Sequence, residues 1–166
     1  GGDAFSVELI KTIKEVIPKS HFYNVYGPTE ITINCFATRV DNLVKDIEKD
    51  KLVPIGKPFD IIDAVILNEN NEDITNENKV GKLFVSGPQT MLGYLDDDEK
   101  TELAFTLDPR YPKFKRKIYN TGDLAIKKEN GLFYLLGRSD DIVKIKGYRV
   151  NPTETNNILS KYEDVK

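Results

Sequence analysis

Residues 23–30 read Tyr-Asn-Val-Tyr-Gly-Pro-Thr-Glu and place two aromatic rings, an amide, a hydroxyl and a carboxylate in one short segment. Tyr26 could lie against a purine ring, and Asn24 carries the donor and acceptor that recognise an adenine edge. Thr29 could donate to a phosphate oxygen, and Glu30 could hold Mg²⁺, which prefers carboxylate and phosphate oxygens. The segment is therefore a candidate nucleotide site, although a strand ending in an ordinary Gly-Pro turn explains the same residues.

Two later segments could complete such a site. Asp123 follows Gly122 at the start of a predicted strand, where a carboxylate can accept both hydroxyls of a ribose; an ordinary turn aspartate is the alternative. Arg138 is a permanent cation that could meet ribose or phosphate oxygens. Asp140 lies where strand pairing is expected to lapse, a position that suits a hinge.

Two further segments are less informative: one has two explanations, and the other has no predicted chemistry. Lys144, Lys146 and Arg149 could form a positive face on one strand, but lysines that protect a solvated edge strand explain the two lysines equally. Residues 81–94 combine glycines with alternating apolar residues, which is typical of turns and close strand approach. We interpret residues 81–94 as scaffold.

Composition excludes several classes of protein. Of the 166 residues, 39% are hydrophobic and 10% are aromatic, which is enough for a core and argues against disorder. A net charge of −3 argues against a nucleic-acid partner. The single Cys35 and the single His21 exclude an internal disulfide and a multi-Cys or multi-His metal site. Apolar runs such as residues 64–67 are too short to cross a bilayer, so we expect no membrane partner and a cytoplasmic location.

Both ends of the sequence look as if they were taken from within a longer chain. The chain begins with Gly1 rather than Met, and its start has no signal-peptide pattern. It stops at Lys166, soon after Pro152 opens a predicted helix. We expect the chain to be an internal fragment of a longer protein.

The hydrophobic pattern predicts a β-rich middle flanked by pieces of mixed α and β structure. Helical spacing predicts helices over residues 6–17 and 96–105, with a weaker pattern over 41–51. Glu-Asn-Gly at residues 129–131 predicts a hairpin. Strands are predicted at residues 21–26, 31–40, 63–67, 82–86, 123–127, 132–136 and 142–145.

In order and spacing these segments resemble the core motifs of the adenylate-forming (AMP-binding) enzyme superfamily. Residues 24–30 are similar to its Tyr-Gly-Pro-Thr-Glu motif, and residues 81–94 are similar to its Gly-Glu-Leu…Gly-Tyr motif. Residues 119–123 are similar to its Thr-Gly-Asp motif, and residues 137–149 are similar to its hinge motif. The resemblance covers essentially the whole chain.

Within the superfamily, the chain looks most like amino-acid adenylation domains, especially stand-alone amino-acid:carrier-protein ligases such as D-alanine ligase. Asn24, residues 93–95 and residues 143–145 favour this branch, whereas residues 151–154 are closer to the CoA ligases. The resemblance implies an α+β fold. Residues 1–139 would be the C-terminal part of the large adenylation domain, with a β-rich distorted barrel and flanking α/β pieces. Residues 140–166 would be the hinge and the start of the small mobile C-terminal domain.

The resemblance also implies roles for individual residues. Asn24 would bind adenine and Tyr26 would stack on it. Thr29 would contact the α-phosphate, and Glu30 would coordinate Mg²⁺; these two residues would be catalytic. The ribose hydroxyls would be held by Asp123 with Arg138.

Other implied roles concern the acyl substrate and the hinge. Asp140 would be the pivot of the small domain, and the amino-acid pocket would be lined by Gly1, Val25, Ile33 and Asn34. Departures from the family pattern include Asn120 in place of Arg or Lys, Lys82 in place of Glu, and Leu135 where an aromatic residue often touches the nucleotide.

The resemblance implies that the parent protein uses ATP to form an aminoacyl-adenylate and releases pyrophosphate. A phosphopantetheine thiol on a carrier protein would then accept the acyl group. Two alternatives stay open: an acyl- or aryl-CoA ligase of the same superfamily, and a non-catalytic β-rich binding module. The Gly-, Ser- and Thr-rich phosphate loop and the catalytic lysine of the family are absent from these 166 residues. We therefore expect this polypeptide alone to be inactive.

Overall fold

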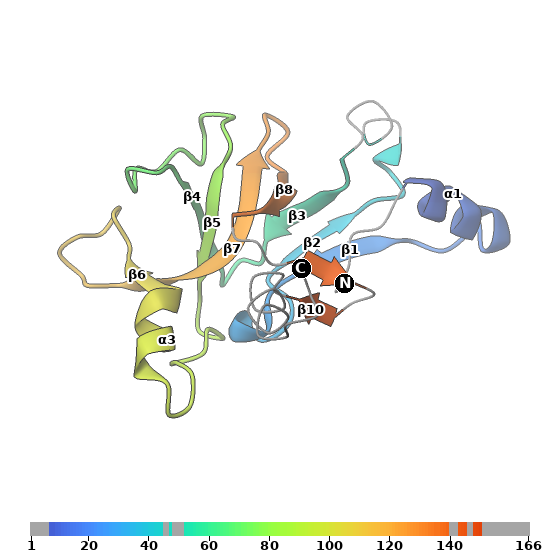
Figure 1. The fold of residues 1–166 in the computed structure, drawn as a ribbon. Helices are drawn as coiled ribbons and strands as arrows, with labels where there is room; N and C mark the ends of the chain where they lie inside the picture. The colour runs from blue at the N-terminus through green and yellow to red at the C-terminus, as the bar shows by residue number, and fades with distance from the viewer. Residues whose placement is uncertain (1–6, 45–46, 48–51, 140–142, 146–147, 151–166) are drawn as a thin grey trace, which may run out of the picture.

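A computed structural model describes residues 7–44, 47, 52–139, 143–145 and 148–150 (Figure 1). Its main element is an eight-stranded antiparallel sheet with the order β1-β2-β3-β8-β7-β5-β4, in which β6 also pairs with β7. The strands are β1 Tyr23–Tyr26, β2 Phe36–Arg39, β3 Pro54–Pro58, β4 Asp63–Leu67, β5 Gly81–Ser86, β6 Phe105–Leu107, β7 Lys117–Lys127 and β8 Phe133–Arg138.

The other elements are α1 (Val7–Val16), a 3-10 helix η1 (Thr29–Ile31), α3 (Asp98–Ala104) and a separate antiparallel pair, β9 (Val143–Ile145) with β10 (Tyr148–Val150). This architecture confirms the expected α+β class with a β-rich centre. None of the helices in the described part of the chain is long and apolar enough to span a membrane.

Several predicted elements are confirmed. The strand at residues 63–67 is β4, and the predicted helices at 6–17 and 96–105 correspond to α1 and α3. The predicted hairpin joins β7 to β8, with Gly131 at a φ of 76° in its turn. Most of residues 41–51 and the helix start at Pro152 lie outside the described residues.

The prediction of a strand over residues 31–40 is wrong for its first half. Residues 29–31 form η1, Thr32 and Ile33 follow with φ values of 57° and 73°, and β2 begins only at Phe36. Hydrophobic alternation suggested an extended chain, but backbone conformation at a tight turn depends on contacts that alternation does not report. The strand β3 was not predicted, because a proline at each of its ends argues against a strand.

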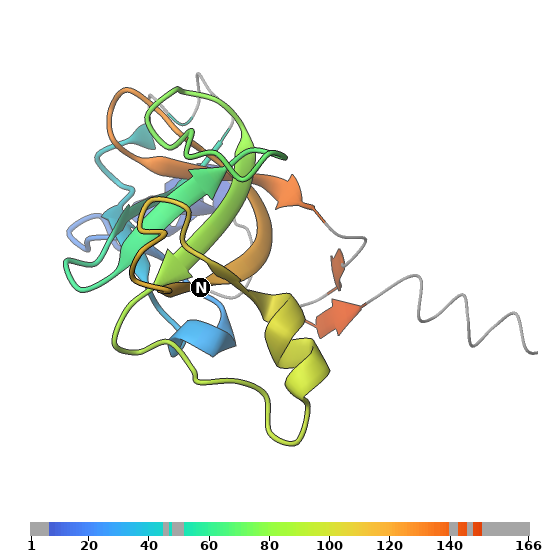
Figure 2. The same ribbon diagram turned by 90° about the vertical axis from the view of Figure 1, so that its left-hand side faces the viewer.

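The predicted strand at residues 123–127 is only the end of β7, which begins at Lys117. The first part of β7 mixes the buried Ile118 and Tyr119 with polar residues, and it pairs with β5 and β6 on its two sides. Its long arc, gold to orange in Figure 2, contributes to the strong curvature of the sheet.

The main core cluster extends over most strands of this sheet, and a second buried cluster, made of Val65, Leu67, Phe84 and Ile118, lies on the opposite face of β4, β5 and β7. Phe36 stacks edge-on against Phe133 with ring centroids 5.2 Å apart, and Tyr26 stacks edge-on against Phe36 at 5.8 Å. Cys35 is fully buried in the same cluster. A smaller cluster of Ile10, Val40 and Ile47 packs α1 against the end of β2. Residues at the end of β1 and at the start of β2 therefore pack in the core on both sides of the segment that joins the two strands.

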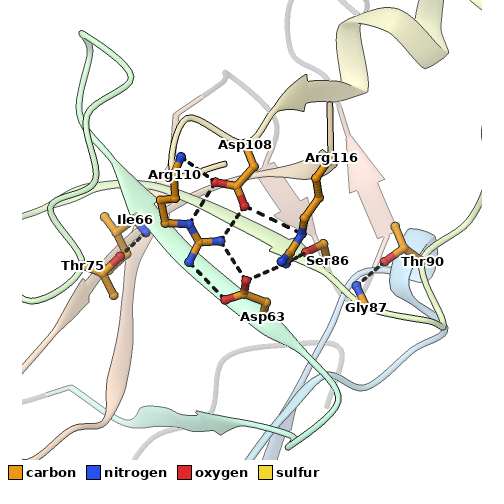
Figure 3. A network of polar contacts seen from close by, with 9 residues as sticks. All are labelled: Asp63, Ile66, Thr75, Ser86, Gly87, Thr90, Asp108, Arg110 and Arg116. Carbon is orange, nitrogen blue, oxygen red and sulfur yellow. Dashed lines mark hydrogen bonds and ion pairs between the residues drawn. The ribbon is translucent and has the colours of Figure 1, made fainter. Parts of the chain in front are cut away.

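An ion network around the buried Asp108 joins the connection between β6 and β7 to β4 and β5 (Figure 3). The buried carboxylate of Asp108 accepts hydrogen bonds from the Arg110 guanidinium at 2.9 and 2.7 Å. Arg110 and Arg116 both bind Asp63 on β4, and Arg116 also binds Ser86 on β5. Burial raises the pKa of Asp108, but the hydrogen bonds from Arg110 and the charges of Arg110 and Arg116 together outweigh burial and hold that pKa below its usual value.

Candidate functional site

Three of the predicted site residues meet across the curved sheet. Tyr26 ends β1, Asp123 lies in β7, and Arg138 ends β8 directly opposite Asp123 in the strand register. The Tyr26 hydroxyl donates to Asp123 Oδ2, and Arg138 Nη1 donates to Asp123 Oδ1 at 3.0 Å. The Asp123–Arg138 pair is shielded, since 14% and 17% of the two side chains are exposed. An aromatic ring, a carboxylate and a guanidinium therefore form one cluster.

The electrostatics of this cluster keep Tyr26 a hydrogen-bond donor. Burial raises the pKa of Tyr26 well above its usual value, and the neighbouring Asp123 charge adds to the shift. The hydroxyl therefore stays protonated and donates to the carboxylate at any physiological pH. This bond also holds the orientation of the Asp123 carboxylate.

Asn24 has a partner that the sequence did not reveal. Its buried side-chain Nδ2 donates to the carbonyl oxygen of Pro54 at 2.8 Å, which ties β1 to β3. The amide predicted to recognise adenine therefore also holds the strand that carries Tyr26.

Glu30 lies in η1, where a second group of residues fixes its position. Glu30 Oε1 accepts a hydrogen bond from the Tyr94 hydroxyl at 2.7 Å, and the Glu30 carbonyl accepts one from the Met91 N–H at 2.8 Å. Burial raises the pKa of Tyr119 on β7 far above its usual value, and the nearby Glu30 charge adds to the shift. The preceding Thr29 is exposed.

Tyr94 is a residue that the sequence reasoning missed. Residues 81–94 were interpreted as scaffold, yet Tyr94 binds the predicted metal ligand. Lys100 Nζ also lies 4.1 Å from the centre of the Tyr94 ring. The signal was present in the resemblance, because Gly93-Tyr94 ends the second motif.

The residues predicted to line a substrate pocket lie close to η1. Val25 is half-buried in β1 beside Tyr26, Asn34 is half-buried, and Ile33 is 68% exposed in the turn after η1. Gly1 and Asp140 lie outside the described residues. The structure thus groups Tyr26 with Asp123 and Arg138, and it places Val25 and Ile33 on the same segment as Glu30.

The donor set fits a nucleotide with a bound magnesium ion. The Asp123 carboxylate, the Arg138 cation and the Tyr26 ring match the hydroxyls and the flat base of a nucleoside. No group of three or more His, Cys, Asp or Glu in the described part of the chain could hold a metal ion. A single carboxylate such as Glu30 could hold Mg²⁺ only together with phosphate oxygens and water, which is the coordination this ion prefers.

Comparisons with known proteins also point to an enzyme family that binds a nucleotide. The AMP-binding enzyme family matches residues 1–95. Over all 166 residues the chain is 32% identical to gramicidin S synthase 2 of Aneurinibacillus migulanus. Among solved structures, IdnL1 is similar over 97% of the chain, with a TM-score of 0.87 and 27% identity. PA1221, an NRPS protein containing adenylation and PCP domains, is similar over 95% of the chain, with a TM-score of 0.81 and 30% identity.

The chain matches only part of each of these proteins. It spans 4% of the length of gramicidin S synthase 2. It spans 32% of the IdnL1 chain and 31% of the PA1221 chain.

Proposed function

Because the chain belongs to the AMP-binding enzyme family, we propose that it supplies nucleotide and substrate contacts to an enzyme that activates amino acids with ATP. The cluster of Tyr26, Asp123 and Arg138 is the observation that carries this proposal. It combines a stacking surface with a carboxylate that is already oriented. A preorganised carboxylate binds ribose hydroxyls without a further loss of side-chain entropy.

In the proposed first step, a carboxylate oxygen of the amino acid attacks the α-phosphorus of ATP. The bond from that phosphorus to the bridging oxygen breaks, and pyrophosphate leaves with the electron pair. Tyr26 stacks on adenine with Asn24 at its edge, while Asp123 and Arg138 hold the ribose. These residues act by positioning, which is the main source of catalysis in transfers at phosphorus.

The proposed metal site supports the same step. Thr29 contacts the α-phosphate, and Glu30 holds Mg²⁺, which supplies positive charge to the phosphates. The Tyr94 hydroxyl holds Glu30 Oε1 in place. A fixed carboxylate of this kind needs little reorganisation during the reaction.

Further roles in the proposal concern the amino-acid pocket and the division of the chain into domains. Val25, Ile33 and Asn34 line the amino-acid pocket together with Gly1. Residues 1–139 belong to the large domain, and Asp140 is the pivot of a small domain that begins in residues 140–166.

In the second step, a phosphopantetheine thiol of a carrier protein attacks the acyl carbon, and AMP leaves. The similarity to PA1221, which contains adenylation and PCP domains, supports a carrier protein rather than free CoA as the acceptor. The proposal places the reaction in the cytoplasm.

The test is exchange of radiolabelled pyrophosphate into ATP by the full-length protein, screened across amino acids and also across aryl and fatty acids. We expect exchange with one or a few amino acids. Asp123→Asn should raise the KM for ATP about tenfold, whereas the exposed Asp60→Asn should leave it unchanged. Exchange with aryl or fatty acids alone would favour a CoA ligase, and exchange with none of the acids would refute the proposal.

A further inference from the structure

The turn after η1 has a backbone conformation that its residues disfavour. Thr32 and Ile33 are both β-branched, yet both have positive φ values, 57° and 73°. The Asn34 N–H donates to the Thr32 carbonyl at 2.9 Å, which closes a three-residue turn around Ile33. A turn of this kind with positive φ at its centre is rare and strained. Contacts from outside the turn must therefore stabilise it.

Gln89 makes those contacts. Its side-chain Nε2 donates to the carbonyl of Ile31 at 2.7 Å and to the carbonyl of Asn34 at 2.8 Å. The backbone carbonyl of Gln89 accepts a hydrogen bond from Thr32 Oγ1 at 2.8 Å. One residue thus bonds to the start, the middle and the end of the strained turn.

Gln89 is itself held in a rigid position. It lies in a four-residue turn, residues 87–90, in which Thr90 Oγ1 accepts from the Gly87 N–H at 2.9 Å (Figure 3). Gly87 packs so tightly that an added Cβ would lie 2.6 Å from Ile62 Cδ1 and 2.8 Å from the Ile61 carbonyl oxygen. On the other side of Gln89, the Met91 N–H binds the Glu30 carbonyl. The turn that carries Gln89 is therefore fixed by Ile61 and Ile62 on one side and by η1 on the other.

The turn is also packed against the nucleotide segment. The Cys35 N–H donates to the Tyr26 carbonyl at 2.8 Å. A Cβ on Gly27 would lie 2.8 Å from Asn34 Cα and 2.9 Å from Cys35 N. Any change in the backbone at residues 31–34 would therefore redirect the side chains of Ile33 and Asn34.

We propose that Gln89 is a positioning residue that holds residues 31–34 in this strained turn, and that it thereby determines which amino acid the enzyme selects. The selectivity part rests on the proposed function, in which Ile33 and Asn34 line the substrate pocket. Residues 87–91 thus have a role in specificity rather than only in the scaffold.

The experiment compares Gln89→Leu and Gln89→Glu with the wild type in the full-length protein. Leu keeps the bulk without hydrogen bonds, and Glu keeps the length but cannot donate to the two carbonyls. We expect the KM for the preferred amino acid to rise about tenfold, because two hydrogen bonds are lost. The KM for ATP should change less than twofold, and discrimination against an amino acid one methylene different should fall.

Two further variants separate positioning from general destabilisation. Adding Thr32→Gly to Gln89→Leu should restore part of the selectivity, since glycine adopts positive φ without strain. Thr75→Val removes a different hydrogen bond between a side chain and the backbone, from the Ile66 N–H to Thr75 Oγ1 at 2.8 Å, in a distant loop. It should lower stability without changing selectivity.

Hydrogen exchange provides a readout that does not depend on activity. In Gln89→Leu, the amides of Thr32, Asn34 and Cys35 should exchange faster than in the wild type, while those of β4 stay protected. Unchanged exchange at these amides would overturn the role of Gln89 in holding the turn. Faster exchange with unchanged selectivity would overturn its role in specificity. Failure of the proposed function would already be visible in the wild type, as an absence of pyrophosphate exchange.

Discussion

The hydroxyl of Tyr26 donates a hydrogen bond to the carboxylate of Asp123, although the two residues are 97 positions apart in the chain. Their strands, β1 and β7, are separated by β2, β3 and β8 in the sheet order. Strands this far apart in the sheet order can meet only if the sheet curves strongly, and the arc of β7 in Figure 2 shows such curvature. The bond joins the residue proposed to stack on adenine to the residue proposed to hold ribose. A change at Tyr26 should therefore also affect how Asp123 binds the ribose.

This coupling predicts the effect of Tyr26→Phe. The variant keeps the stacking ring but removes the donor to Asp123 Oδ2, so only Arg138 still holds the carboxylate and its orientation is less fixed. We expect the free energy of unfolding to fall by about 1–3 kcal/mol and the KM for ATP to rise several-fold. Urea denaturation and pyrophosphate exchange measure the two effects. Tyr23→Phe, at an exposed tyrosine on the same strand, is the matched control and should change neither.

The buried Asp108 predicts a pH-dependent contribution to stability. At neutral pH, Asp108→Asn should lower the free energy of unfolding by about 3 kcal/mol, because Arg110 loses a buried charged partner. The folded-state pKa of Asp108 lies below the unfolded value of about 3.9, so this stabilisation is complete above that pH. It is lost as the pH falls through the folded-state pKa.

Urea titrations of wild type and Asp108→Asn between neutral and acidic pH measure this contribution. The difference in unfolding free energy between them should shrink as the pH drops below about 4. Asp60→Asn, at an exposed aspartate, is the control and should show no such difference. A gap between wild type and Asp108→Asn that widens in acid would contradict the assignment.

Cys35 should be chemically inert in the folded protein. Burial raises the pKa of its thiol to about 12, so roughly one molecule in ten thousand carries the reactive thiolate at pH 8. The thiol is also fully buried. We expect no labelling by iodoacetamide in native buffer and complete labelling in denaturant, read by mass spectrometry. Rapid native labelling would place Cys35 outside the core.

Gly27→Ala should disrupt the turn at residues 31–34. The new Cβ would meet backbone atoms of Ile33, Asn34 and Cys35, which cannot move aside without opening the turn. We expect a loss of about 3 kcal/mol or more in unfolding free energy. Gly131→Ala, where φ is +76° and the added Cβ has space, should cost only about 1 kcal/mol. Equal losses in the two thermal or urea titrations would show that close packing at Gly27 is unimportant.

Local sequence pattern predicts the elements whose burial follows a regular spacing of apolar residues. Residues 63–67 and α1 were predicted because apolar spacing reports which face of an element is buried. The turn at Thr32 and Ile33 was predicted as a strand. Its conformation depends on Gln89, more than fifty positions away in the chain. Likewise β3 forms despite Pro54 and Pro58 because its neighbours β2 and β8 provide its pairing.

The order of the motifs was enough to identify the family and to name Tyr26, Glu30, Asp123 and Arg138 as candidate site residues, because residue chemistry and spacing are properties of the chain itself. Tertiary structure alone decided which of these side chains meet. It brings Tyr26 into a hydrogen bond with Asp123, Tyr94 into one with Glu30, and Gln89 into hydrogen bonds with the turn that contains Ile33. The reason is physical: these hydrogen bonds join segments distant in the chain, and their geometry is set by the curvature of the sheet and the packing of its loops.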